Sequence, residues 1–263
     1  MNNYVLITGA SKGLGLEFAK LFAKDGYPLI IVARSHNLLE EIKKDLITTY
    51  GVQVVVIEKD LTKINAATEL YYEVKSQNLR VDYLVNNAGF GDYGEFLDGD
   101  ITKYENMINL NIMTLMKLCY LFGNDMRENK YGKIMNVASI ASFFAGPFMA
   151  TYYATKAFVL SFSEAISKEF ASYGITVTAL CPGTTATHFF DNANATSDKT
   201  NLLKNMHPAP AYDVAKYGYQ KMMKGKVVAI AGTKNRLAIF MNRFISRKLS
   251  RHIVYNIQRK RRN

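Results

Sequence analysis

Three side chains suited to proton transfer stand at fixed offsets in the second half of the chain. Ser139 is followed thirteen residues later by Tyr152, and Lys156 comes four residues after that tyrosine. Residues four apart share one face of a helix, so a helix beginning here would place the phenol beside the ammonium group. Tyr153 has Ala157 four residues on, which makes Tyr152 the candidate acid.

This set of side chains suits the reduction of a carbonyl group. A tyrosine has an ordinary pKa of about 10, which is too high for efficient proton transfer near neutral pH. We expect the Lys156 ammonium to lower the pKa of Tyr152 and Ser139 to donate a hydrogen bond to the developing alkoxide. A Tyr/Lys pair alone is more often structural, so the prediction depends on the glycine-rich loop that accompanies it.

That loop follows the first apolar run and reads Thr8-Gly9-Ala10-Ser11-Lys12-Gly13-Leu14-Gly15. Its GxxxGxG spacing departs from the GxGxxG fingerprint of dinucleotide-binding loops, but the physical logic is shared. Gly9 allows a tight turn, Gly13 lets backbone N–H groups approach a pyrophosphate, and Gly15 lets the helix pack on the strand. The helix N-terminus adds positive potential. A glycine-rich turn without a ligand is the alternative, which the strand–loop–helix context disfavours.

Two cations indicate which dinucleotide would bind. Arg34 follows the second predicted strand, where an acidic residue would bind the adenosine ribose of NAD, and Lys12 lies inside the glycine-rich loop. Cations at these places favour a 2′-phosphate and hence NADP, although Arg34 as a solvated surface cation is the alternative. Asp60, after the third predicted strand, is expected either to accept from the adenine amino group or to cap the following turn.

The elements that must position these residues are short apolar runs alternating with helical patterns. The runs lack regular polar alternation, which is typical of strands covered on both faces. The predicted strands are Tyr4–Thr8, Pro28–Ala33, Gln53–Ile57, Tyr83–Val85, Lys133–Val137, Thr176–Leu180 and Val227–Ala231. Helices are predicted over Leu14–Lys24 and Leu38–Thr49, with Asn37 capping the second. The pattern predicts an α/β fold with a doubly wound, Rossmann-like parallel sheet of seven strands, and a loop over Asp191–Asn205.

With these motifs in place, the sequence resembles the short-chain dehydrogenase/reductase superfamily over about residues 3–232. The glycine-rich loop, Ser139 and the Tyr152/Lys156 pair carry the resemblance. The other matching residues are Asp60-Leu61, Asn86-Asn87-Ala88-Gly89, Asn111, Pro182-Gly183 and Thr187. The segment from Asn86 to Phe96 is similar to a bacterial branch with a basic C-terminal extension, itself similar to 3-ketoacyl and hydroxysteroid reductases.

The resemblance implies roles for many residues. Asn111, Ser139, Tyr152 and Lys156 would be catalytic, with Asn111 holding a water in a proton relay and Lys156 binding the nicotinamide ribose. The cofactor-binding residues would be Gly9, Ser11, Lys12, Gly13, Leu14, Gly15, Arg34, Ser35, Asp60, Leu61, Asn87, Ala88, Gly89, Tyr152, Lys156, Pro182, Gly183, Thr185 and Thr187. Thr185 is a mild departure, because the family usually has an apolar β-branched residue there.

Aromatic side chains follow several predicted strand ends, where doubly wound sheets bind ligands. The candidate substrate residues are Phe90, Tyr93, Phe143, Phe144, Phe148, His188, Phe189 and Phe190. So many aromatic groups predict an apolar ketone, aldehyde or alcohol of ring or acyl type as substrate. Ordinary core or lid packing is the alternative for each. A non-catalytic NADP-binding module that reports redox state to a partner or membrane is the alternative function.

Composition and charge exclude several classes of protein. Cys119 and Cys181 are expected to be free thiols, and the four dispersed histidines predict no metal site. Residues 1–213 carry 19 Lys and Arg against 22 Asp and Glu, a net charge of −3, whereas residues 214–263 carry 14 basic residues and no acidic one. A basic tail on a near-neutral body makes nucleic-acid binding unlikely. The absence of a visible signal peptide predicts a cytoplasmic protein.

The tail is expected to form a basic amphipathic helical extension over residues 233–263, after a catalytic unit over 1–232. Leu237, Met241, Ile245, Leu249, Ile253 and Ile257 recur every four residues, as on one face of a helix or of two shorter ones. This face could pack on the domain as a wall of the substrate pocket, lie on an anionic membrane, or accompany nucleic-acid binding. The resemblance also implies a homodimer formed by the segments Tyr104–Phe122 and Tyr152–Phe170.

Overall fold

The core of the fold is one parallel sheet of seven strands in a computed structural model that describes residues 3–187, 189, 193 and 208–259. The strand order is β3-β2-β1-β4-β5-β6-β7, and every neighbouring pair is parallel. The strands are β1 (Asn3–Thr8), β2 (Leu29–Ala33), β3 (Val54–Glu58), β4 (Arg80–Asn86), β5 (Gly132–Val137), β6 (Ile175–Cys181) and β7 (Val228–Ile230). The predicted doubly wound α/β fold is thereby confirmed.

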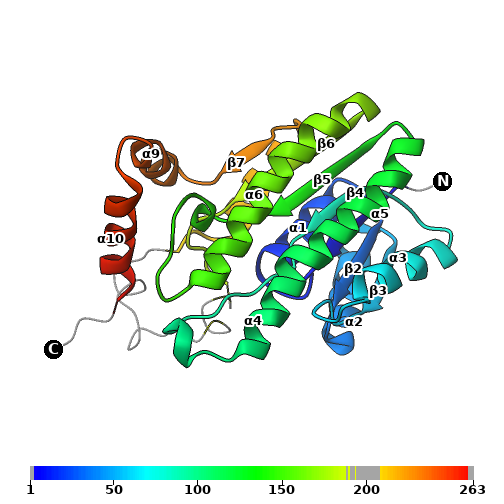
Figure 1. The fold of residues 1–263 in the computed structure, drawn as a ribbon. Helices are drawn as coiled ribbons and strands as arrows, with labels where there is room; N and C mark the ends of the chain where they lie inside the picture. Colours follow the sequence, from blue (N-terminus) through cyan, green and yellow to red (C-terminus); the bar gives the residue numbers. More distant parts are fainter. Residues whose placement is uncertain (1–2, 188, 190–192, 194–207, 260–263) are drawn as a thin grey trace.

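Helices cover both faces of this sheet, as the apolar character of its strands requires. They are α1 (Gly13–Lys24), α2 (His36–Tyr50), α3 (Ala66–Ser76), α4 (Ile101–Ile108), α5 (Leu115–Glu128), α6 (Ala150–Phe170), α8 (Ala211–Met223), α9 (Thr233–Asn242) and α10 (Arg247–Gln258). One core cluster joins the sheet to α3, α5 and α6, and a second joins it to α1, α2 and α8. Figure 1 shows α5 and α6 in front of the sheet, α1 behind it, and α9 and α10 standing out at one side.

Two helical details differ from expectation. Ser35, and not Asn37, is the N-cap residue of α2, because the backbone is extended at Ser35 and helical from His36 onward. The long helix predicted around Tyr104–Phe122 is divided by a π-helical turn, η2 (Asn109–Thr114), which lies between α4 and α5. Short 3₁₀ segments, η1 (Phe96–Asp98), η3 (Ile140–Phe143) and η4 (Ala171–Tyr173), complete the described helices.

The tail contains the two shorter helices, α9 and α10. The apolar stripe does not form the packed side: Leu237, Leu249 and Ile253 are exposed. The packed side is formed instead by the buried Ile239 and by the polar residues Asn242, Ser250 and Gln258, all of which lie off the stripe. The division at residue 232 stays a prediction. Among the described helices, none combines the length and apolar character needed to cross a membrane.

Candidate active site

The candidate residues gather at one edge of the sheet because every strand is parallel and ends there. The glycine-rich loop follows β1, Asn87 follows β4, Ser139 lies two residues after β5, and Pro182 follows β6. The order of strands reverses between β1 and β4, and open α/β sheets bind their ligands in the crevice at such a point. Residues far apart in sequence therefore meet at one place.

The glycine-rich loop has a shape that only glycine permits. Gly9 and Gly13 have positive φ angles of 65° and 55°. A Cβ on Gly15 would lie 2.2 Å from the carbonyl oxygen of Gly9, so the start of α1 touches the loop directly. Lys12 occupies the N-cap position of α1 without a side-chain capping bond. The backbone N–H groups of the first helical turn, beside Ser11 and Leu14, are thus at the edge of the crevice.

Asn87 and Thr8 brace this loop against the end of β4. The Asn87 side-chain amide donates to the carbonyl oxygens of Thr8 and Gly9 at 3.0 and 3.1 Å. The Thr8 hydroxyl accepts from the backbone N–H groups of Asn87 and Ala88, both at 3.0 Å. Thr8 is buried. No role of its own is predicted for it from the sequence, although its position directly before Gly9 indicates a residue that could support the loop. The interaction fixes the width of the crevice between β1 and β4.

The residues expected around the adenosine lie at the ends of β2 and β3. Arg34 and Ser35 are exposed directly after β2, and Leu61 is buried after β3. Asp60 accepts from the backbone N–H and the hydroxyl of Thr62 at 3.1 and 2.8 Å, so the turn-capping alternative describes its contacts. Burial raises the pKa of Asp60, but these hydrogen bonds and the charges of Lys63 and Arg34 outweigh it and leave the pKa below its usual value.

Helix α6 carries Tyr152 and Lys156 on one buried face, as predicted. Tyr152 is 9 % exposed and Lys156 is 5 % exposed, and the Lys156 Nζ atom lies 5.8 Å from the centre of the Tyr152 ring. Lys156 donates to the carbonyl oxygen of Val137, at the end of β5, at 2.7 Å. Ser139 caps η3 by accepting from Ala141 at 3.1 Å, which fixes the hydroxyl close to Tyr152.

The pKa shifts of this pair differ from the expected ones. Burial raises the pKa of Tyr152 well above its usual range, and its hydrogen bond with Ser139 offsets only part of the rise. Burial lowers the pKa of Lys156 to about 8, with a smaller opposing effect from Cys181. The expected lowering of the Tyr152 pKa by Lys156 is therefore wrong for this structure, because desolvation dominates and the ammonium group points to the Val137 carbonyl.

Asn111 lies in the π-helical turn and is 2 % exposed. Its side chain accepts from the backbone N–H of Phe90 at 3.2 Å and donates to the Phe90 carbonyl at 3.0 Å and to the Thr155 hydroxyl at 3.1 Å. A Cβ on Gly89 would lie 3.0 Å from the Asn111 Oδ1 atom and 3.5 Å from the Lys156 Nζ atom. The Asn111 amide oxygen and the Lys156 ammonium group therefore face the same glycine. Thr155 supports Asn111 through its hydroxyl, and in the sequence only its position between Tyr152 and Lys156 indicated such a role.

The segment after β6 approaches the glycine-rich loop from the other side. A Cβ on Gly13 would lie 2.9 Å from the Thr187 Cγ2 atom, and one on Gly183 would lie 2.4 Å from the Asn235 Nδ2 atom of α9. Pro182 accepts from the backbone N–H of Ile140 at 2.9 Å. Thr185 is buried and donates to the Gly183 carbonyl at 3.0 Å, which gives its hydroxyl a local partner.

The substrate candidates separate into two groups. Phe90, Tyr93 and Phe189 pack in one cluster with Tyr152, and the Phe189 ring centre lies 5.1 Å from that of Tyr152. Phe148 joins them through Tyr93, with ring centres 5.9 Å apart. Phe143 packs on the core cluster beneath α6 instead, and Phe144 is half-buried at the end of η3 with no described contact to Tyr152. His188 and Phe190 lie outside the described residues.

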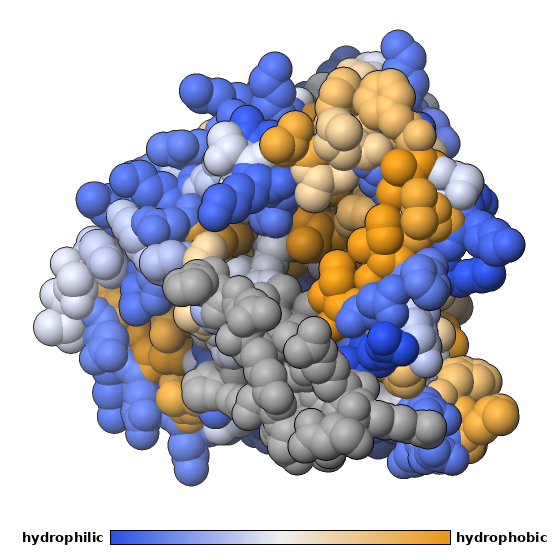
Figure 2. All heavy atoms as spheres, turned by 90° about the vertical axis from the view of Figure 1, so that its left-hand side faces the viewer, coloured by the Kyte–Doolittle hydropathy of each residue, from blue (hydrophilic) through white to orange (hydrophobic). Residues whose placement is uncertain are grey.

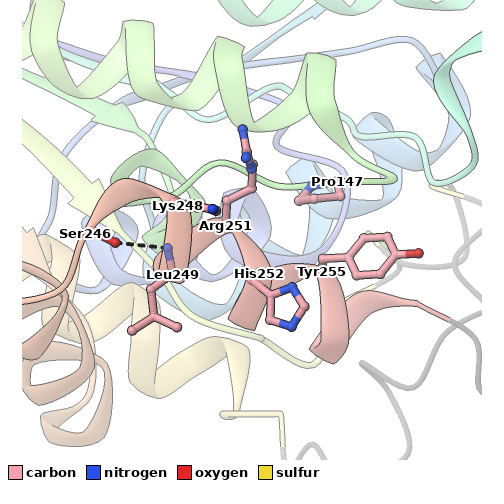
Figure 3. A pocket seen from close by; sticks show the side chains of 7 residues that line it. All are labelled: Pro147, Ser246, Lys248, Leu249, Arg251, His252 and Tyr255. Atoms are coloured by element: carbon pink, nitrogen blue, oxygen red, sulfur yellow. Dashed lines mark hydrogen bonds between the residues drawn. The ribbon is translucent and has the colours of Figure 1, made fainter.

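Helix α10 reaches this cluster, which the sequence did not reveal. The side-chain amide of Gln258 donates to the Tyr153 hydroxyl, and the backbone carbonyl of Gln258 accepts from the Tyr93 hydroxyl at 2.7 Å. Tyr255 stacks on Phe148 with ring centres 5.4 Å apart. Beside these contacts lies a cleft of about 420 Å³ lined by Pro147, Ser246, Lys248, Leu249, Arg251, His252 and Tyr255 (Figure 3). No local signal marks Gln258, since its partners are more than 100 residues away.

Comparison with known proteins agrees with this geometry. The family model of short chain dehydrogenases matches residues 3–198. The chain is 30 % identical over 232 residues to the 7beta-hydroxysteroid dehydrogenase of Clostridium sardiniense, covering 88 % of this chain and 86 % of that protein. It is 33 % identical over 202 residues to the very-long-chain 3-oxoacyl-CoA reductase of Anas platyrhynchos, covering 74 % of this chain but only 64 % of that protein.

A solved structure has the same fold over nearly the whole chain. The short-chain dehydrogenase from Sphingobium yanoikuyae in complex with NADPH has a TM-score of 0.82 and 27 % identity, and the match covers 92 % of this chain and 93 % of that one. The motifs, the sheet and the comparisons agree, and the chain belongs to the short-chain dehydrogenase/reductase family of oxidoreductases.

Proposed function

We propose that the protein is an NADP-dependent oxidoreductase that transfers a hydride between nicotinamide and the carbonyl or secondary alcohol of an apolar substrate. The observation that carries the proposal is the meeting of Ser139, Tyr152, Lys156 and Asn111 at the edge of the crevice that the glycine-rich loop borders. A proton donor, a cation and a hydrogen-bond donor beside a dinucleotide cradle are the parts that carbonyl reduction needs.

The residues of the crevice fit a dinucleotide. No side chain stands at Gly9, Gly13 or Gly15, where a pyrophosphate would approach. Glycine is needed there because Gly9 and Gly13 have positive φ angles and Gly15 touches the loop backbone. Arg34 and Lys12 are exposed at the ends of β2 and of the loop, where their charges suit a 2′-phosphate. NADPH in the Sphingobium yanoikuyae structure supports the same choice. Asn87, Ala88 and Gly89 would line the crevice, and Pro182, Gly183, Thr185 and Thr187 would close it.

The side chains at the crevice each have one proposed task. The reduced nicotinamide supplies the hydride when bound. The Tyr152 hydroxyl donates a proton to the substrate oxygen, and burial keeps this phenol protonated at neutral pH. The Ser139 hydroxyl hydrogen-bonds the same oxygen and so stabilises the negative charge that develops on it. The Lys156 ammonium group would lie beside the ribose of a bound cofactor, and Asn111 fixes the Phe90 backbone and Thr155 near it.

The aromatic cluster around Tyr152 indicates the class of substrate. Phe90, Tyr93 and Phe189 offer apolar surface with one phenol hydroxyl already bonded to Gln258, so the pocket favours a ring or acyl group. Relatives named for hydroxysteroid and very-long-chain 3-oxoacyl-CoA substrates support this class. We therefore propose an apolar ketone of ring or acyl type, or the corresponding secondary alcohol.

Two variants, one at Tyr152 and one at the adjacent Tyr153, test the proposal. The full chain is assayed for NADPH oxidation with aldehydes, cyclic ketones, keto-steroids and 3-ketoacyl thioesters. Tyr152→Phe keeps the ring and removes the proton, so turnover should fall by at least ~10²-fold with NADPH binding nearly unchanged. Tyr153→Phe is the matched control, since it removes a hydroxyl from the adjacent residue whose partner is Gln258.

The control should keep turnover within about threefold, because that hydroxyl makes a single hydrogen bond outside the proton path. Full turnover by Tyr152→Phe at saturating substrate would assign the acid to another residue. NADPH binding without turnover of any substrate class would favour the non-catalytic NADP-binding module.

A further inference from the structure

The two C-terminal helices present an unpartnered apolar surface. Seven large side chains on α9, α10 and the turn between them are between 42 % and 70 % exposed. They are Leu237, Phe240, Met241, Phe244, Leu249, Ile253 and Ile257. Figure 2, which views the molecule from the side of these helices, shows apolar side chains gathered in a band with hydrophilic ones along its borders. Contiguous exposed apolar surface of this kind marks a site of contact with another body.

The apolar surface is bordered by cations that lack carboxylate partners. Every Lys and Arg described in α9, the turn and α10 is exposed, and the sequence has no acidic residue after Asp213. Arg243, Arg247, Lys248 and Arg251 form no ion pair with any carboxylate of the described residues. Like charges four residues apart on a helix, as at Arg247 and Arg251, are mildly destabilising. An external anion would offset this cost.

Polar contacts hold the two helices so that this surface faces outward. Asn242 donates to the Phe143 carbonyl at 3.2 Å, and Ser250 of α10 donates to Asn242 at 2.7 Å. Gln258 is 1 % exposed and joins the end of α10 to Tyr153. In Figure 3, Leu249 and Arg251 point to opposite sides of α10, so this apolar side chain and this cation lie on different faces of the helix. The packed side is thus already taken, and the apolar stripe is free for another partner.

The combination of charge and apolar area selects among partners. A nucleic acid would meet the cations but would leave the exposed Phe244 and Leu249 in water. A second copy on a two-fold axis would bring the same all-positive surface against itself, and like charges across an interface are costly. A bilayer containing anionic lipid meets both requirements, because apolar side chains enter the interface while Lys and Arg bind headgroup phosphates.

We propose that the surface of α9 and α10 binds anionic phospholipid bilayers. The cleft lined by Lys248, Leu249, Arg251 and His252 lies on this part of the molecule, and its lining includes both basic and apolar side chains. Because Tyr255 and Gln258 contact Phe148 and Tyr153, α10 would lie between the bound bilayer and the aromatic cluster around Tyr152. The binding itself is independent of the proposed reaction.

Vesicle sedimentation tests the proposal with the full chain. Vesicles of phosphatidylcholine with about 30 % phosphatidylglycerol should bind the protein at low salt, vesicles of phosphatidylcholine alone should bind it weakly, and salt near ~0.5 M should release most of it. Each cation near an anionic bilayer strengthens binding about fivefold. The variant Arg247→Gln, Lys248→Gln, Arg251→Gln should therefore lower the partition coefficient by roughly 10- to 10²-fold.

Two further variants separate bilayer binding from general charge attraction and from assembly. Lys24→Gln, Lys44→Gln, Lys224→Gln removes the same charge from exposed sites elsewhere and should change binding by less than about threefold. Leu249→Ser with Ile253→Ser keeps every charge and should lower binding at least about tenfold, since two apolar side chains no longer enter the bilayer. Circular dichroism and the unfolding midpoint verify the fold of each variant.

Four outcomes would overturn the proposal. The wild type could fail to bind anionic vesicles, or the control triple could lose as much binding as the α10 triple. The Leu249/Ile253 variant could bind as well as the wild type, which would leave only electrostatic adsorption. A fall in oligomeric state of that same variant without vesicles, measured by light scattering, would assign the surface to contact between copies of the chain.

Discussion

Burial shifts the pKa values of Tyr152 and Lys156 in opposite directions, so both are held toward their neutral forms in the absence of bound cofactor. The phenol stays protonated at any physiological pH, which is the state needed to donate a proton to a ketone. The ammonium group of Lys156, with a pKa of about 8, is mostly charged at pH 7 and mostly neutral at pH 9. We therefore expect the proposed reduction of a ketone to be favoured toward lower pH.

A pH profile of the reaction tests the protonation state of Lys156. The ratio kcat/KM for NADPH reports ionisations of the free enzyme, and it should fall as pH rises through about 8, because neutral Lys156 no longer attracts the anionic cofactor. Lys156→Arg keeps a cation at all these pH values, so its lower ratio should show no such decline. A wild-type ratio that is constant between pH ~7 and ~9.5 would contradict the assignment of this ionisation to Lys156.

We expect cofactor choice to be decided by single residues as well. Arg34→Asp replaces the exposed cation after β2 by a carboxylate, and NADPH binding should weaken by roughly 10- to 10²-fold while NADH binding improves, because a charge-assisted hydrogen bond is worth about 1.5–3 kcal/mol. Dissociation constants of both cofactors measure this. Lys44→Asp makes the same charge change on an exposed position of α2 and should leave the preference intact. Equal or tighter binding of NADH by the wild type would remove the basis for NADP.

At the scale of elements, α10 is attached by few contacts, yet these reach the aromatic cluster around Tyr152. Ser250 and Gln258 are its buried residues. A chain ending at residue 245 should therefore fold with nearly the same unfolding midpoint and bind NADPH normally. Its KM for an apolar ketone should rise about 2- to 10-fold, since Tyr255 no longer supports Phe148 by an aromatic contact worth about 0.5–1.5 kcal/mol.

Steady-state kinetics on this truncated chain and the full chain make the comparison. Unchanged KM for every ketone would exclude α10 from the substrate site. A large fall in kcat with loss of NADPH binding would show instead that α10 is needed for the fold.

Sequence predicted the strands well wherever the apolar run was unbroken, and less well where charge interrupts it. The fourth strand was expected over Tyr83–Val85 but begins at Arg80, because Arg80 and the fully buried Asp82 satisfy each other at 2.8 Å. The π-helical turn around Asn111 leaves no mark in the apolar pattern, since the helices on either side continue it. Which side of the tail packs depends on Asn242 and Gln258, whose partners Phe143 and Tyr153 are distant in sequence, and on Ser250, which joins α10 to Asn242.

In the candidate site, too, features set by local sequence could be predicted and features set by distant residues could not. The glycine-rich loop and the Tyr152/Lys156 pair could be predicted because local geometry fixes them: a turn that only glycine permits and one face of a helix. The pKa of Tyr152 could not, because it depends on desolvation by groups from several elements, among them Phe189 and Met149. Spacing predicts which residues meet, whereas burial decides their protonation.

For the whole molecule, we expect a homodimer formed by α4, α5 and α6. Ile101, Ile108, Met113 and Tyr120 are exposed on or between α4 and α5, and α6 lies beside them. Light scattering at micromolar concentration should give a dimer, and Met113→Glu with Tyr120→Glu should shift it to monomer, because charges would be buried at the interface. Ile47→Glu, an exposed position of α2 on the opposite face of the sheet, should leave the dimer intact.

A monomeric wild type would refute this interface. A tetramer would show that the chain has a second interface besides the one formed by α4, α5 and α6.

The central place of β1 in the sheet also sets the order in which the protein can assemble during synthesis. The first strand made pairs on one side with β2, which follows within 30 residues, but on the other with β4, which begins at Arg80. Long-range parallel pairing is slow, and until β4 has emerged from the ribosome one edge of β1 is bare. The crevice between β1 and β4 cannot exist before then, and α10, which is translated after every strand of the sheet, contacts Tyr93, Phe148 and Tyr153 later still. A nascent chain can therefore form this crevice well before α10 packs against the aromatic cluster.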